Sequence, residues 1–347
     1  LESNRVATEI HDRLFARAVA IKDGQQTIAL VSVDSIGVQG PTVASVRALL
    51  PQVDYVLVAS THTHAAPDCI GLWGPDQTTS GVSGTYLAQL EAGIVQAVRD
   101  AVAAAEPARA YYGTAEDVAL LGDFRLPKVY DPVLRTLRFE NEDGRTVGIV
   151  VQWNAHGIEP RDNPRVTRDF MGVTTDELAR RHECPVVYFS GAIGGLMGTP
   201  DNAELFTVDG ERISDAFQAI DIYGRAVADL ADGALSAATP VRLDPIIVAA
   251  RTIAIPLDNA GYRMARKLGI LPRPAFQSTG DPYRLGEAVP AEQIEGDITF
   301  ATEVAYLQLG ELGVAAITGE LSHELVYGEF QEPVAAAADF ADAPMET

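Results

Sequence analysis

The sequence has only two cysteines, few basic residues and no long apolar run. Cys69 and Cys184 are far apart and form no CxxC pair, so a framework of disulfide bonds is not expected. Two buried free thiols are favoured over one bridge, because cysteine is among the most often buried residue types. No apolar run has the length of a membrane-spanning helix. Residues 1–5 contain no signal-peptide core, so we expect that any such segment was removed or never present.

Basic residues are scarce: 26 lysines and arginines stand against 48 aspartates and glutamates, a net charge of −22. Nucleic acids and anionic membranes bind through a basic footprint, so this balance argues against both as partners. It suits a soluble protein that is secreted or periplasmic, with the cytoplasm as the alternative. Hydrophobic residues make up 47% of the chain and charged residues 21%, which is enough apolar material for a globular core.

Alternating strand-forming and helix-forming segments predict an α/β fold with a mixed central β-sheet flanked by helices. Asp-Gly turns at residues 22–24 and 141–144 predict two hairpins. The last third is predicted to be β-rich. We expect one domain over residues 1–330 and an irregular tail over 331–347. The expected strands are 14–21, 28–33, 54–59, 108–114, 133–139, 146–153, 185–189, one or two within 241–257, 300–309 and 314–318. The expected helices are 41–50, 85–105, 171–182 and 214–238.

The stretch Ser60-Thr61-His62-Thr63-His64 follows the apolar run 54–59, which is typical of a buried strand. Two histidines separated by one residue at the end of a strand are expected to project from the same face. Imidazole is the commonest protein ligand for zinc-like metals. A single histidine at a strand end is more often an ordinary hydrogen-bonded residue, but this pair favours a ligand pair or an active site.

Other predicted strands also end in polar residues, namely Asp34, His156, the loop of residues 190–195 and Glu320. Ligands of open α/β sheets bind beyond the carboxyl ends of the strands, and parallel neighbours would bring these ends together. Two or three histidines with a carboxylate are the ligands of a catalytic zinc that keeps a water position open. Such a metal activates water and polarises a carbonyl. These residues therefore predict a mononuclear metallohydrolase.

The remaining histidines have weaker contexts. His11 and His182 are expected at the surface. His323 lies one helical turn beyond Glu320 if that segment is helical, and it is a candidate partner of the metal ligands.

Several segments resemble the neutral/alkaline ceramidase family, in its N-terminal catalytic domain, and identify the chain as a divergent, bacterial-type relative. The likeness extends in order over about residues 10–330, and the THTH segment is its most specific part. The segments are SVDSIGV (32–38), ASTHTHAAPD (59–68), RLPKVYDPVLRTLRF (125–139), WNAHGIEP (153–160), TRDFMG (167–172), FSGAIGGLMGTP (189–200) and ITGE (317–320).

The resemblance implies a three-layer fold and one zinc ion held by His62, His156 and Glu320. A fourth ligand of the family, a tyrosine, would lie beyond the end of this chain unless Tyr327 replaces it, so we expect the chain to be truncated. The resemblance further implies that His64 and Arg125 act as catalytic residues on the substrate or its oxyanion.

The glycine-rich loop departs from the family, because it lacks the Gly-Asp that precedes the family's catalytic serine. Gly194, Gly195 and Thr199 are assigned to substrate binding, and Thr199 alone could replace the serine. Metal-activated water is therefore the expected nucleophile, with His64 as the proton carrier.

The implied function is zinc-dependent hydrolysis of the amide bond of an N-acyl, ceramide-like substrate in lipid metabolism. An esterase or another C–N or C–O hydrolase, and a non-catalytic homologue that binds metal or ligand, are the alternatives. The sequence does not match the HxHxDH signature of metallo-β-lactamases, because Ala66 and Pro67 stand where that signature has Asp and His. Eight regular βα units of an amidohydrolase barrel are not evident. Ile70, Leu72, Trp73, Leu196 and Met197 either line an apolar groove for an acyl chain or anchor their loops on the core.

Overall fold

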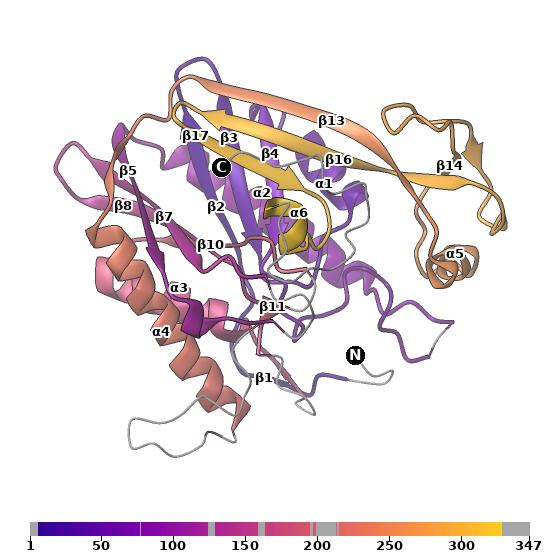
Figure 1. Cartoon of the computed structure of the whole chain (residues 1–347), viewed down its shortest axis with the longest axis horizontal. Coiled ribbons are helices and arrows are strands. Elements are labelled where there is room, and N and C mark those ends of the chain that lie inside the picture. The colour runs from indigo at the N-terminus through magenta and orange to yellow at the C-terminus, as the bar shows by residue number, and fades with distance from the viewer. Residues whose placement is uncertain are drawn as a thin grey trace.

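Two adjoining β-sheets form the middle layer of the structure, with helices on one side and a third sheet on the other (Figure 1). The computed structural model describes residues 6–76, 78–123, 129–158, 164–194, 197–198, 213 and 215–327. Strands pair in both parallel and antiparallel fashion, which confirms the predicted α/β class with mixed pairing. The predicted tail, residues 331–347, lies outside the described residues.

The first sheet has the order β2-β3-β4 and carries the His-x-His segment at its end. β2 and β3 form the predicted antiparallel hairpin, and β4 lies parallel to β3. Two helices pack on one face of this sheet around Val31, Val56 and Ile94. The elements are β2 (Ala16–Lys22), β3 (Thr27–Val33), α1 (Gly40–Ala48), β4 (Tyr55–Ser60) and α2 (Gly84–Ala103).

The second sheet has the order β10-β8-β7-β5-β12, and its β8 strand leads to His156. β7 and β8 form the second predicted hairpin, and β10 lies parallel to β8. Helices α3 and α4 bury Trp153, Phe170 and Tyr223 against it. The elements are β5 (Ala108–Glu116), β7 (Val133–Asn141), β8 (Thr146–Trp153), α3 (Asp169–His182), β10 (Val186–Ser190), α4 (Ala216–Ser236) and β12 (Thr239–Val241).

The third sheet covers the other face of the first sheet. Ile28 and Leu30 from β3 pack there with Leu307 and Leu309, and Phe139 and Phe189 of the second sheet border the same core. Its elements are β13 (Ile246–Pro256), β14 (Ala275–Gln277), β15 (Ala288–Val289), β16 (Ile298–Leu309) and β17 (Leu312–Ile317). The short elements β1 (Glu9–Ile10), η1 (Val118–Leu120), β6 (Gly122–Asp123), β9 (Arg165–Val166), β11 (Met197–Gly198), α5 (Ala260–Lys267) and α6 (His323–Tyr327) complete the described chain.

Two further sequence expectations can be compared with this structure. Both Cys69 and Cys184 are buried free thiols, as the sequence favoured. No helix in the described part of the chain combines the length and the apolar composition that a membrane span requires.

An ion pair joins α1 to the third sheet. Both terminal nitrogens of Arg47 donate to the carboxylate of Glu303, at 3.0 and 2.8 Å, and the Tyr55 hydroxyl donates to it at 2.8 Å. The hydrogen bonds from Arg47 lower the pKa of the Glu303 carboxyl. Ionised Glu303 therefore stabilises the fold above the unfolded-state pKa of glutamate, about 4.3. This stabilisation is lost as the pH falls through the lower pKa of the folded state.

We expect Glu303→Gln to lower the free energy of unfolding by about 1 kcal/mol at neutral pH, and by less in acid, because the stabilisation by ionised Glu303 declines as the pH falls below the unfolded-state pKa. Urea unfolding between pH 7 and pH 3 measures both effects. Glu292→Gln, at an exposed position, is the matched control. A loss of the same size at both ends of this pH range would contradict the assignment.

Candidate metal centre

The His-x-His segment leaves β4 through an unusual backbone conformation. The N–H groups of Thr61 and His62 donate to the carbonyls of Val33 and Ser35, at 2.9 and 3.0 Å, which continues the pairing beyond the strand. His62 then has φ 66°, in the left-handed region that side-chain-bearing residues rarely adopt. The rings of His62 and His64 are 4.7 Å apart, but strand alternation is not the reason, because the chain turns at His62.

The ring of His62 is oriented by the main chain. Its Nδ1 lies 2.7 Å from the carbonyl oxygen of Ile36, and because that oxygen can only accept, Nδ1 carries the proton. The other ring nitrogen, Nε2, is buried, forms no hydrogen bond with any of the described residues, and lies 3.0 Å from Oε1 of Glu320. A ring N–H on a backbone carbonyl, with the opposite nitrogen left for a ligand, is the usual arrangement of a metal-binding histidine.

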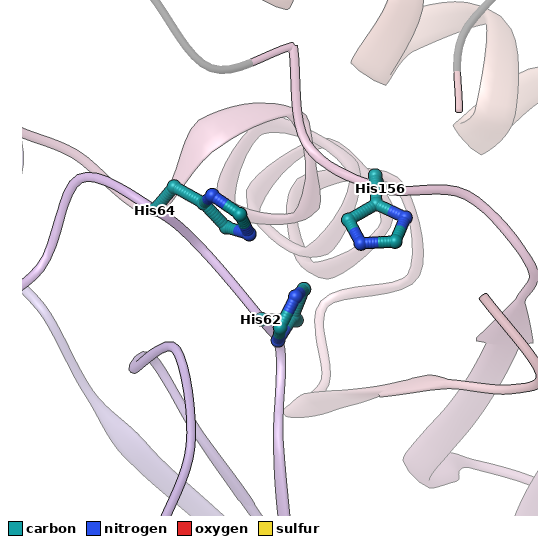
Figure 2. Close-up of side chains that lie close together, drawn as sticks. All are labelled: His62, His64 and His156. Carbon is teal, nitrogen blue, oxygen red and sulfur yellow. The ribbon is translucent and has the colours of Figure 1, made fainter. Parts of the chain in front are cut away.

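Three imidazoles gather at this point. His156 follows β8, and its ring centroid is 4.9 Å from that of His62 and 5.9 Å from that of His64. One ring nitrogen from each histidine lies within 4.8 Å of the other two. Figure 2 shows His62 and His64 on one chain segment and His156 on another, with the three side chains projecting into a common space. This is the convergence that the strand-end argument predicted for His62 and His156.

Glu320 completes the group from the third sheet. Gly319, at φ 100°, turns the chain after β17, and Glu320 then faces two of the rings. Its Oε1 lies 3.0 Å from Nε2 of His62, and its Oε2 lies 3.5 Å from Nε2 of His156. Contacts with the imidazoles of His156 and His62 hold the pKa of the Glu320 carboxyl well below its usual range. The carboxylate is therefore ionised, as a metal ligand must be.

The three ligand-bearing strands do not belong to one parallel sheet. β4, β8 and β17 lie in three different sheets, and their ends meet where these sheets adjoin. The expectation that parallel neighbours of a single sheet gather the ends was therefore wrong in its reason, although it placed these residues together.

Asp34, another polar residue at a strand end, is not grouped with the three histidines among the described residues but stabilises the start of β2. It is buried, its carboxylate accepts from the N–H of Phe15 at 2.8 Å, and it pairs with Arg17 at 3.3 Å. Burial raises the pKa of the Asp34 carboxyl, against the opposing charge of Arg17. Asp34 therefore holds the start of β2, and it is not a member of the histidine group found among the described residues.

Several residues assigned from the sequence cannot be placed. Arg125, Gly195 and Thr199 lie outside the described residues, as does the side chain of Tyr327. Gly194 is described, and its N–H donates to the carbonyl of Leu321 at 2.8 Å, so the predicted substrate contact cannot use this N–H.

The other histidines are also placed. His323 is buried at the start of α6, so Glu320 precedes that helix and is not one turn before His323 on it. His11 is exposed, and His182 pairs with Asp232 at 2.6 Å.

The apolar residues of the loop after His64 mostly anchor it. Ile70 and Leu72 pack against Ala265, Ile270 and Leu271 near α5. The helix α5, which the sequence analysis missed, thus supports the loop beside the histidines.

The sequence analysis also missed the residues that hold the histidine segments. The hydroxyl of buried Thr63 donates to the carbonyl of Thr167 at 2.8 Å, and the N–H of Thr167 donates to Ala65 at 3.0 Å. Asp169, at the start of α3, accepts from the N–H of Ile158 at 3.0 Å and so fixes the loop after His156. The polar TRD run before a helical segment was the available signal, because an acidic residue in the first helical turn is typical of a helix start.

The donor set suits a zinc-like cation. Imidazole nitrogens and a carboxylate oxygen are ordinary zinc ligands, and within the described part of the chain no hydrogen bond occupies the buried Nε2 of His62. The residues present therefore fit a divalent metal ion. With three imidazoles and one carboxylate, the group can fill three or four coordination positions.

This arrangement of sheets and helices is the fold of the neutral ceramidases. The crystal structure of neutral ceramidase from Pseudomonas aeruginosa matches with a TM-score of 0.66 at 16% identity, over 90% of this chain and 57% of that one. A ceramidase complexed with C2 matches with a TM-score of 0.67 at 15% identity, over 92% and 60%. The chain thus spans less than two thirds of the length of these proteins. No protein-family model and no curated protein matches it by sequence.

We expect Thr63→Val to lower the free energy of unfolding by about 1–3 kcal/mol, because it leaves the buried carbonyl of Thr167 and the N–H of Ala65 without their partner. Chemical denaturation of the metal-free protein measures the loss. Thr114→Val, at an exposed position in β5, is the matched control and should stay within about 0.5 kcal/mol of wild type. Equal effects of the two substitutions would show that the hydroxyl of Thr63 does not hold this segment.

Proposed function

We propose that this chain is a zinc-dependent hydrolase that cleaves the amide bond of an N-acyl, ceramide-like substrate. The observation that carries the proposal is the contact of Glu320 with His62 and His156, at 3.0 and 3.5 Å, at the junction of three sheets. The fold shared with neutral ceramidases supports the reaction class and the substrate class. In this proposal His62, His156 and Glu320 hold one zinc ion.

A zinc ion bound there would polarise a carbonyl oxygen and make water a stronger nucleophile at neutral pH. Ionised Glu320 balances part of the cation's charge, and Ile36 keeps the ring of His62 in the required tautomer. We assign His64 to take the proton from the attacking water and to deliver it to the leaving amine nitrogen. The water oxygen bonds to the carbonyl carbon, and the C–N bond then breaks as the nitrogen receives the proton from His64. The products are a carboxylic acid and an amine, and the acid gives up its remaining proton to the amine, which leaves a carboxylate and an ammonium ion. We assign Arg125 to the developing oxyanion.

We expect His62→Ala and His156→Ala to lose most of the zinc, because each removes a nitrogen from a small ligand set. Elemental analysis of the purified proteins measures the zinc content, with about one ion per wild-type chain expected. His182→Ala, which breaks only a pair with Asp232, is the control and should keep its zinc. Full zinc content in both test variants would exclude the proposed centre.

We expect His64→Ala and Arg125→Ala to retain zinc and to hydrolyse N-acyl amides about 10²–10³-fold more slowly, because a proton carrier or an oxyanion contact is lost. Turnover of an N-acyl amide panel and the matching esters, measured with zinc content on the same samples, separates the roles. Zinc loss in His64→Ala as large as in His62→Ala would make the third imidazole a ligand instead. Zinc binding by wild type without turnover of any amide or ester would favour a non-catalytic binding protein.

A further inference from the structure

The segment of residues 190–194, which begins at the last residue of β10, touches each of the three ligand-bearing segments. At its start, the hydroxyl of Ser190 donates to the carbonyl of Thr61 at 3.0 Å. Thr61 directly precedes His62, whose backbone has the left-handed conformation. This bond therefore ties the end of the second sheet to the point where the first sheet presents its histidine.

The next contact is with the segment that leads to His156. The N–H of Gly191 donates to the carbonyl of Trp153 at 3.1 Å. A Cβ atom at position 191 would lie 2.0 Å from Oδ1 of Asn154 and 2.1 Å from Nε2 of Gln152. Asn154 is itself fixed by its amide, which donates to the carbonyl of Asp131 at 3.1 Å. A side chain at position 191 would have to displace these two side-chain amides at the end of β8.

The last contact is with the segment that carries Glu320. The N–H of Gly194 donates to Leu321, and residue 194 pairs with Ser322 as an isolated parallel bridge. A Cβ atom at position 194 would lie 2.7 Å from the carbonyl carbon of Leu321, 2.8 Å from the nitrogen of Ser322 and 2.9 Å from the oxygen of Glu320. All three are backbone atoms, so a side chain at position 194 must displace the main chain beside Glu320.

We infer that residues 190–194 are the positioning segment of the metal centre, and that Gly194 sets the place of Glu320 relative to His62 and His156. The inference rests on the proposed function for the identity of the metal. It assigns the glycines at 191 and 194 to close packing against the ligand-bearing chain, whereas the sequence analysis assigned Gly194 to substrate. Gly194 touches no metal or substrate in this role and acts only through Glu320.

The test compares Gly194→Ala with Gly93→Ala, because a Cβ at position 93 on α2 meets no atom within 4 Å. The dissociation constant for Zn²⁺ is measured on metal-free protein by competition with a chromophoric chelator. The visible spectrum of the Co²⁺ form reports the coordination geometry. We expect Gly194→Ala to weaken Zn²⁺ binding about 10–100-fold and to change the Co²⁺ spectrum, the size typical for partners that orient a ligand. Gly93→Ala should change neither.

A double-mutant cycle with Glu320→Ala separates positioning from general damage. Once Glu320 is absent, Gly194→Ala should weaken Zn²⁺ binding no further, because the ligand that it displaces is gone. If Gly194→Ala does not fold, Ser190→Ala replaces it, and His62→Ala replaces Glu320→Ala in the cycle. We then expect Ser190→Ala to weaken Zn²⁺ binding several-fold, and to have no further effect once His62 is absent.

The outcomes distinguish this inference from the proposed function. Wild-type protein that binds no Zn²⁺ would overturn the proposed function and this inference with it. Wild-type protein that binds Zn²⁺, together with a Gly194→Ala variant that binds it as tightly, would overturn only the positioning role. An equal loss with and without Glu320 would also overturn that role.

Discussion

The contact between one carboxylate and two imidazoles depends on three sheets keeping a fixed relative position. Glu320 meets His62 and His156 only because β17, β4 and β8 end at one place. The apolar core between the first and third sheets fixes two of these ends, and α3 with α4 fixes the second sheet. A shift of 1 Å at any of these packings would separate groups that are 3.0 and 3.5 Å apart. The site is therefore a property of the whole fold rather than of a local motif.

Much of the fold could be predicted because local patterns determine it. The hairpin at Asp23-Gly24, the strand before Thr61 and the long helices follow from turn chemistry and apolar periodicity. The helix α5 could not be predicted in this way, because it has only eight residues and includes Gly261. The junction of the three sheets could not be predicted either, because the periodicity of a strand does not determine which sheet it joins.

The candidate ligands could be predicted from the sequence, but the residues that hold the ligand-bearing segments in place could not. His62, His64, His156 and Glu320 stand out because titratable residues after apolar runs are unusual. Thr63 and Asp169 were missed, because their importance lies in hydrogen bonds to chain segments that only the fold brings near. The glycine-rich loop stands out in the sequence by its composition. The structure gives a steric reason for glycine at two of its positions, because a Cβ at 191 or 194 would overlap neighbouring atoms.

The wide spacing of His62, His156 and Glu320 along the chain affects how the site forms during synthesis. A nascent chain that has emerged only as far as residue 300 already contains every imidazole of the group but lacks its carboxylate. Contacts of such large sequence separation form late, because the entropy of closing long loops opposes them. Cation binding that needs Glu320 would then begin only after synthesis has passed this residue, and proteolytic removal of β17 and Glu320 would take away the carboxylate while the three imidazoles and most of the core persist.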